Sequence, residues 1–286
     1  MPKQKTNVKA KTTRRRTLAP TARRARADPP PPAPRRGMVI VHGGGDIAPD
    51  YYLGLVQGVQ AQLGKPFEFI AAYYSDVITE HMPGIAATVD SPAVEKFKAE
   101  YEKQLRETHT RNRQDHPGSA GATGFLGIDA ALGDTVNEVV RYIFDGDAAA
   151  QVQIRLKKAF DQAMQDYDEI VLVTHSLGTV ATYDVLRQFA AQYKIAIWFT
   201  LGCPLGKLVK LRFRPASLGA IALPNVARWH NVYDTNDFVA DVIGAYFHAS
   251  DFRVHDIFVE VANAMPDAHD YFKNPETQAL LADALR

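Results

Sequence analysis

The sequence predicts an α/β fold in which helices flank a mostly parallel central sheet. Short apolar runs rich in Val and Ile, typical of buried strands, recur along the chain, and stretches with apolar residues at helical spacing separate them. Strands that alternate with helices in this way form parallel sheets that are covered on both faces. A chain of 286 residues with 46% apolar content is long enough to bury such a core.

The individual elements follow from local patterns. Apolar runs predict strands at residues 38–41, 67–72, 170–173, 195–201, 228–233 and 254–261. Helical periodicity predicts helices over 52–63, from 91 onward, over 134–144 and 148–167, after Gly178, and from about 275.

Residues 73–133 interrupt the alternation and resemble an insertion carried on the core. A helix begins at Ser91, and a glycine-rich stretch follows it. Phe125, Leu126 and Ile128 lie among these glycines, which is typical of a mobile apolar flap. We therefore expect a cap or lid here; a surface loop beneath a packed helix is the alternative.

Residues 1–36 form a basic, proline-rich tail. They carry four Lys and eight Arg against a single Asp, whereas the whole chain has a net charge of +1, so the remaining residues sum to −10. With few large apolar residues, the tail is predicted to be disordered. A solvated leader is the first interpretation, weak electrostatic contact with an anionic membrane or nucleic acid the second, and a targeting peptide the third.

The composition also excludes several classes of protein. With Cys203 as the lone cysteine, no disulfide can form within the chain, and neither an oxidising compartment nor a structural zinc cage is indicated. No apolar run reaches about 18 residues, so no membrane-spanning helix is expected. A secretory signal would need an apolar core that the tail lacks, and we expect a cytoplasmic protein with no required protein partner.

The segment from Thr174 to Gly178 connects a predicted strand directly to a predicted helix, with Ser176 at its centre. A sharp strand-to-helix turn exposes a serine hydroxyl for nucleophilic attack and aims the first helical N–H groups at a developing oxyanion. Residues two before and two after the serine have to be small in such a turn. Gly178 satisfies this, whereas Thr174 is larger than the usual glycine. Helix capping by Ser176 is the alternative interpretation.

Acyl transfer at Ser176 requires hydrogen-bond donors for the negative oxygen that forms. The N–H group of Leu177, directly after the serine, is predicted to be one of them. The glycine run at 43–45 is predicted to supply the other, because glycine lets the backbone approach a substrate closely. We choose Gly44 within this run and expect His42 to orient the loop; a simple glycine turn is the alternative.

The carboxylate of such a site is expected on a loop after Ser176, and the histidine later still. Asp234, Asp237 and Asp241 all follow the strand at 228–233. We choose Asp237, with Asp234 next, and expect an unused Asp to cap a turn.

Three later histidines, His248, His255 and His269, are available as the general base. His255 lies at the edge of a predicted strand and is expected to pack there. His269 lies in a polar loop between the last predicted strand and the last helix, so we choose His269, with Asp237 holding its tautomer.

Together these segments resemble the α/β-hydrolase superfamily, in particular its lipase- and esterase-like members. The matching segments are residues 41–45, 174–178, 231–239 and 268–271, and residues 201–206 are similar to a Gly-Ser-Pro-Leu segment of the family with Cys203 in the Ser place. The resemblance spans about residues 37–286. It implies an α/β-hydrolase fold, a triad of Ser176, Asp237 and His269, and neither a metal nor an organic cofactor.

The resemblance also implies an activity. It points to a serine hydrolase that cleaves a carboxylic ester, of a small molecule or a lipid, through an acyl-enzyme intermediate. Thioesterases, amidases and acyltransferases share that intermediate, and a non-catalytic binding protein that kept the fold is a rival of another class. The superfamily hosts many reactions, so the substrate does not follow from the fold.

Overall fold

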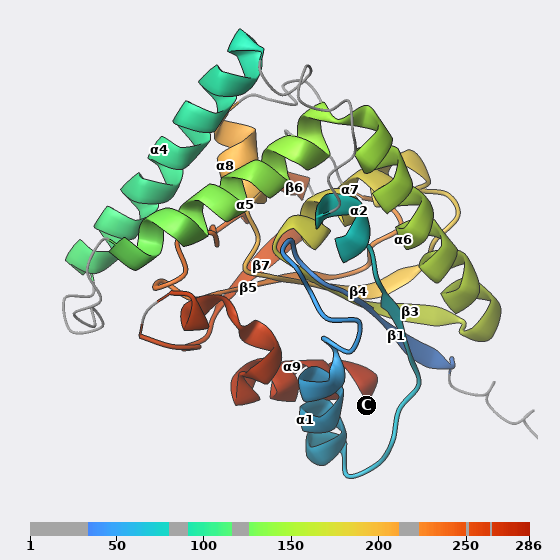
Figure 1. The fold of residues 1–286 in the computed structure, drawn as a ribbon. Coiled ribbons are helices and arrows are strands. Elements are labelled where there is room, and N and C mark those ends of the chain that lie inside the picture. The colour runs from blue at the N-terminus through green and yellow to red at the C-terminus, as the bar shows by residue number, and fades with distance from the viewer. Residues whose placement is uncertain (1–33, 80–90, 116–125, 212–222, 250–251, 264) are drawn as a thin grey trace, which may run out of the picture. The chain divides into compact units, whose positions relative to one another are not determined.

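Within the part of the chain that the structure describes, six parallel strands form one central sheet. The computed structural model describes residues 34–79, 91–115, 126–211, 223–249, 252–263 and 265–286, with the backbone alone for 112–115, 126–132, 248–249 and 252. The strand order is β2-β1-β3-β4-β5-β7, and the short strand β6 pairs antiparallel with β7 at one edge. The predicted α/β class with a mostly parallel sheet is therefore confirmed (Figure 1).

The strands are β1 (Arg36–Val41), β2 (Phe69–Ala72), β3 (Glu169–His175), β4 (Ile195–Leu201), β5 (Trp229–Tyr233), β6 (His248–Ala249) and β7 (Phe252–Phe258). The helices are α1 (Leu53–Leu63), α2 (Ser75–Thr79), α4 (Pro92–Asp115), α5 (Leu126–Phe144), α6 (Gly146–Asp166), α7 (Leu177–Gln188), α8 (Leu205–Lys210) and α9 (Pro275–Leu285). Two 3₁₀ turns, η1 (Asp267–His269) and η2 (Tyr271–Lys273), precede α9. Among the helices described, none is long and apolar enough to cross a membrane.

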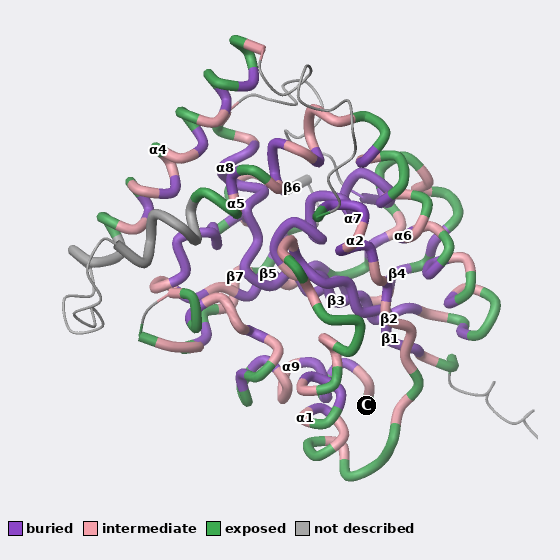
Figure 2. Tube along the Cα trace, viewed as in Figure 1, coloured by how far each residue is buried: buried purple, intermediate pink, exposed green. Residues whose placement is uncertain are grey.

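Alternate residues of each strand point to opposite faces of the sheet, and helices cover both faces. Met38 and Ile40 of β1 pack in the core that includes α1 and α9, whereas Val39 and Val41 pack in the core that includes α4 to α7. Figure 1 shows α1 and α9 on one side of the sheet and α5, α6 and α7 on the other. Figure 2 shows the central strands β1, β3 and β4 as the most deeply buried part of this arrangement, and all but one or two residues of each are buried. Burial on both faces explains why β1 and β4 have nearly uninterrupted apolar sequences.

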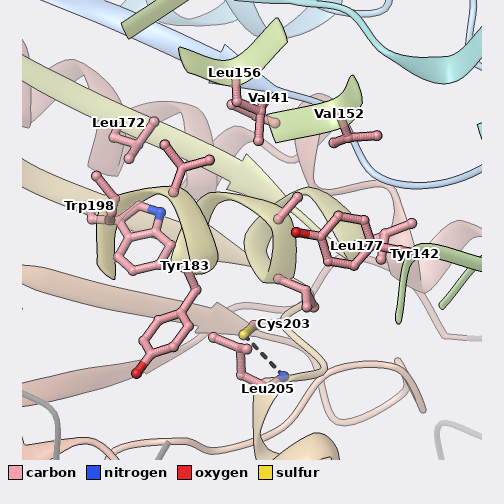
Figure 3. Packing of buried hydrophobic residues seen from close by; sticks show 14 of the residues in the cluster. Val41, Tyr142, Val152, Leu156, Leu172, Leu177, Tyr183, Trp198, Cys203 and Leu205 are labelled. Carbon is pink, nitrogen blue, oxygen red and sulfur yellow. Dashed lines mark hydrogen bonds between the residues drawn. The ribbon is translucent and has the colours of Figure 1, made fainter. Parts of the chain in front are cut away.

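The helix after β3 is buried along most of its length. Every residue of α7 from Leu177 to Leu186 is buried. Figure 3 shows Leu177 and Tyr183 among the packed side chains of this core, together with Trp198 of β4. Because its first turn is packed, the start of α7 is held firmly beside the end of β3.

Some strand boundaries differ from the prediction. β1 begins at Arg36, inside the range predicted as tail, because the Arg36 guanidinium donates to Glu169 of the neighbouring strand over 2.8 Å. β2 begins at Phe69, two residues later than predicted, and β7 covers Phe252–Phe258 instead of 254–261. The predicted disorder of the tail falls almost wholly on residues 1–33, which lie outside the described residues.

The predicted insertion at 73–133 contains α2, α4 and the first part of α5. α5 begins at Leu126, so Gly127 and Gly133 lie inside a helix; the sequence pattern stopped short of them because glycine disfavours helix by about 1 kcal/mol. The buried side chains of α4, such as Val94 and Phe97, belong to the same core as the sheet. The predicted apolar flap falls on residues that are outside the described ranges or described by backbone alone.

Candidate active site

Ser176 occupies a strained turn between β3 and α7. Its φ of 49° and ψ of −126° make it the one non-glycine residue with positive φ among the residues described. A residue other than glycine in such a conformation costs on the order of 1–3 kcal/mol, and surrounding structure has to enforce it. The Ser176 amide donates to the carbonyl oxygen of Leu201 over 2.9 Å, and its side chain makes no capping hydrogen bond to α7. The helix-cap interpretation of Ser176 is therefore wrong.

The neighbours of Ser176 fit the cramped turn in two different ways. A Cβ atom on Gly178 would lie 2.1 Å from the carbonyl oxygen of His42, so only glycine fits there without a shift. Thr174 is accommodated because its hydroxyl is satisfied inside the core. It lies 2.9 Å from the Thr179 hydroxyl and accepts a 2.9 Å hydrogen bond from Trp198 Nε1.

The glycine loop after β1 packs directly against this turn. A Cβ atom on Gly43 would lie 2.9 Å from both Ser176 Cβ and His175 Nδ1. The Tyr74 hydroxyl donates to the carbonyl oxygens of His42 and Gly43 over 2.7 and 3.0 Å, and the Ser75 hydroxyl donates to that of Gly45 over 2.7 Å. Several hydrogen bonds therefore hold the loop in place, with Gly43 packed against the Ser176 side chain.

His42 orients this loop through both ring nitrogens. Its Nε2 accepts from the Tyr74 amide at 3.0 Å, so Nδ1 carries the proton and donates to the Gly43 carbonyl oxygen at 2.6 Å. Burial lowers the pKa of His42 to about 4, which keeps the ring neutral and this tautomer stable at neutral pH.

Asp237 and His269 form the hydrogen-bonded pair of the site. His269 Nδ1 lies 2.7 Å from Asp237 Oδ2, and Asp237 is fully buried while the His269 side chain keeps 18% of its exposure. Tyr271 donates to the same carboxylate oxygen over 2.9 Å, and the Val239 amide donates to the other over 2.9 Å. His269, Tyr271 and Val239 all donate hydrogen bonds to the Asp237 carboxylate. Asp237 therefore fixes the proton of His269 on Nδ1, so that Nε2 is the nitrogen that can accept a proton.

Competing influences set the charge of Asp237. Burial alone would raise its pKa, but the neighbouring His269 and the hydrogen bonds from His269, Val239 and Tyr271 together bring the pKa below its usual value. Asp237 is therefore an anion at neutral pH, as a carboxylate that stabilises an imidazolium has to be.

The other two candidate carboxylates have different partners. Asp234 accepts hydrogen bonds from the amides of Asn236, Val261 and Ala262, over 2.8, 2.7 and 3.2 Å, so it crosslinks two loops. Asp241 pairs with Lys207. Among the three aspartates, the hydrogen bond to His269 belongs to Asp237.

His269 lies beside the Ser176 turn through contacts on two sides. His175, directly before the serine, donates from Nε2 to the His269 carbonyl oxygen over 2.9 Å, and the two rings lie 4.3 Å apart. Burial, reinforced by the nearby His269, lowers the pKa of His175 to about 3, so it stays neutral. On the other side, a Cβ atom on Gly202 would lie 2.7 Å from His269 Cε1. Gly202 follows Leu201, the residue whose carbonyl oxygen holds the Ser176 amide.

A buried lysine braces the loop that carries Asp237. The Lys207 side chain of α8 has no exposed surface, and its Nζ donates to the carbonyl oxygens of Val239 and Ala240 over 3.1 and 3.0 Å. The same Nζ lies 3.1 Å from Asp241 Oδ1. Burial lowers the pKa of Lys207, and the carboxylate of Asp241 opposes that shift.

Lys207→Met should lower the free energy of unfolding by about 3–5 kcal/mol, because it removes the buried cation nearest to the Asp241 carboxylate and leaves two carbonyl groups without their donor. Urea unfolding followed by circular dichroism measures this change. Lys210→Met is the matched control: Lys210 Nζ lies 3.9 Å from the same carboxylate but its side chain is 39% exposed, so less than about 1 kcal/mol should be lost. Equal losses for the two variants would show that Lys207 is not the brace.

Several contributors to the site were not predicted from the sequence: Tyr271, His175 as a holder of His269, Lys207, and the Tyr74 and Ser75 hydroxyls that hold the glycine loop. A partial signal existed for Lys207, which lies between Leu205 and Leu208 in an apolar segment. No protein-family model matches the chain, and no curated protein matches it either.

Proposed function

We propose that this chain is a serine hydrolase with an α/β-hydrolase fold, which cleaves a carboxylic ester, of a small molecule or a lipid, through an acyl-enzyme intermediate. The observation that carries the proposal is the strained Ser176 turn at the end of β3, with the hydrogen-bonded Asp237–His269 pair beside it. The Ser176 side chain does not cap α7, so the strain of its backbone requires another reason, and placing a nucleophile between the strand and the helix provides one.

The proposed reaction follows from the roles of these groups. His269 Nε2 takes the proton of Ser176 Oγ as the oxygen attacks the ester carbonyl carbon, and the imidazolium then protonates the leaving alcohol. Asp237 stabilises the imidazolium without taking its proton. Water attacks the acyl-enzyme by the same route in reverse, which releases the acid and restores the serine.

The proposed oxyanion donors are the backbone N–H groups of Leu177 and Gly44. Leu177 is the first residue of α7, and the first N–H groups of a helix have no acceptor within it. Each oxyanion donor typically contributes a factor of about 10²–10³ in kcat.

Labelling with a fluorophosphonate tests this proposal against a non-catalytic binding protein of the same fold. The native protein should gain one phosphonyl group, mapped by peptide mass spectrometry to Ser176, and should hydrolyse p-nitrophenyl hexanoate with saturation kinetics. Urea-unfolded protein is the control, because it has the same serines without an activating base. Absence of labelling together with absence of hydrolysis would overturn the proposal.

A further inference from the structure

Glu138 of α5 lies against the glycine loop, although no predicted site residue comes from that helix. A Cβ atom built on Gly44 would lie 1.9 Å from Glu138 Oε2 and 2.7 Å from its carboxyl carbon. A Cβ atom on Gly45 would lie 3.8 Å from Oε1. The carboxyl group is therefore in contact with the backbone that is proposed to bind the oxyanion.

The charged and titratable groups around Glu138 come from several elements. Asp134 lies on the same helix, and the carboxyl group also interacts electrostatically with His269 of η1 and with the Tyr74 phenol. Burial raises the pKa of Glu138 to about 7; the Gly45 backbone hydrogen bond opposes the shift, Asp134 adds to it, and His269 lowers the pKa. The group thus changes charge close to neutral pH.

A substrate bound for attack by Ser176 has to approach this carboxyl group. Its carbonyl oxygen would accept from the amide at Gly44, and that residue is the one against which Glu138 Oε2 lies. In a partly buried site a carboxylate repels another negative charge much more strongly than it does in bulk water. A negative charge on the acyl chain should therefore weaken binding of the ester beside Glu138.

We propose that Glu138 contacts the acyl part of the bound ester and selects against acyl chains that carry a negative charge. This inference rests on the proposed hydrolase function. A purely structural role, in which the carboxyl group only holds the Gly45 amide, is the alternative, and it predicts no effect on substrate charge preference.

The experiment compares two esters of equal chain length, p-nitrophenyl hexanoate and mono-p-nitrophenyl adipate, which differ in a terminal carboxylate. The measured quantity is the ratio of kcat/KM for the adipate ester to kcat/KM for the hexanoate ester, at low ionic strength and pH 8. Glu138→Gln should raise this ratio about tenfold, because the amide keeps the shape and an acceptor for the Gly45 amide but carries no charge. Asp134→Asn, which removes an exposed carboxylate from the same helix, should change the ratio less than twofold.

The pH dependence gives a second measurement on the unaltered protein. Below pH 7 Glu138 is mostly neutral and above pH 7 mostly ionised, so the adipate-to-hexanoate ratio should fall as pH rises from 6 to 8. In Glu138→Gln the ratio should be flat over this range.

Failure of this inference is distinguishable from failure of the proposed function. Ser176-dependent hydrolysis of the hexanoate ester, with the same ratio in wild type and Glu138→Gln and no pH trend, would overturn the role of Glu138 alone. An absence of hexanoate hydrolysis and of fluorophosphonate labelling would overturn both proposals.

Discussion

Ser176→Ala should lower kcat for hydrolysis of p-nitrophenyl hexanoate by about 10⁶-fold, because no other atom of the site can form the acyl-enzyme and the remaining groups act only through it. The oxyanion donors and substrate binding would still leave a small rate above the reaction in water. Steady-state kinetics at saturating ester measure the change, with active-site titration to exclude wild-type contamination.

The Ser176→Ala substitution should affect the chemical step and leave folding unchanged, since alanine removes one hydroxyl that makes no capping hydrogen bond to α7. Ser91→Ala is the control, because the Ser91 hydroxyl accepts from the Val94 amide at the start of α4 and takes no part in the site. It should leave kcat within twofold of wild type. Retention of more than about 1% of wild-type kcat in Ser176→Ala would place the nucleophile elsewhere, given the size of the expected loss.

Asp237→Asn should lower kcat by about 10⁴-fold while the protein stays folded, because the amide selects the wrong tautomer of His269. Oδ1 of residue 237 has to accept from the buried Val239 amide, so the amide nitrogen of Asn would face His269 Nδ1. Nδ1 would then have to accept, and the histidine proton would move to Nε2. In that state Nε2 cannot take the proton of Ser176.

Asp234→Asn is the matched control for this effect. Asp234 is a buried carboxylate of the same loop, but it accepts from three backbone amides and makes no hydrogen bond to His269. This variant should lose stability, measured by urea unfolding, and keep kcat within about tenfold, the size of effect expected for indirect displacement of a catalytic group. A larger loss of kcat for Asp234→Asn than for Asp237→Asn would exchange their assigned roles.

The parts of this protein that were predictable from sequence depend on residues near one another in the chain. The strand β3, the Ser176 turn and the helix α7 form one continuous segment, so apolar periodicity and the small residue at Gly178 were enough to indicate them. The β4 boundaries also coincide with the prediction, since an apolar run buried on both faces has clear ends. Glycine-containing segments such as the start of α5 were predicted less well, because packing can override a weak propensity.

Which loop residues meet was decided by the tertiary structure. Asp234 and Asp237 lie three positions apart on one loop and have the same chemistry, and their separate roles depend on amides from 261–262 and on a ring from position 269. Lys207 likewise has its partners more than thirty positions away.

The sequence by itself determined the α/β class, the order of the strands along the chain and the position of the Ser176 turn. The tertiary structure alone decided that Asp237 holds His269, that Lys207 braces their loop, and that Glu138 lies over the glycine loop. The physical reason is that periodicity and turn chemistry are properties of neighbouring residues, whereas hydrogen bonding and burial of charge depend on which distant segments the packed core brings together.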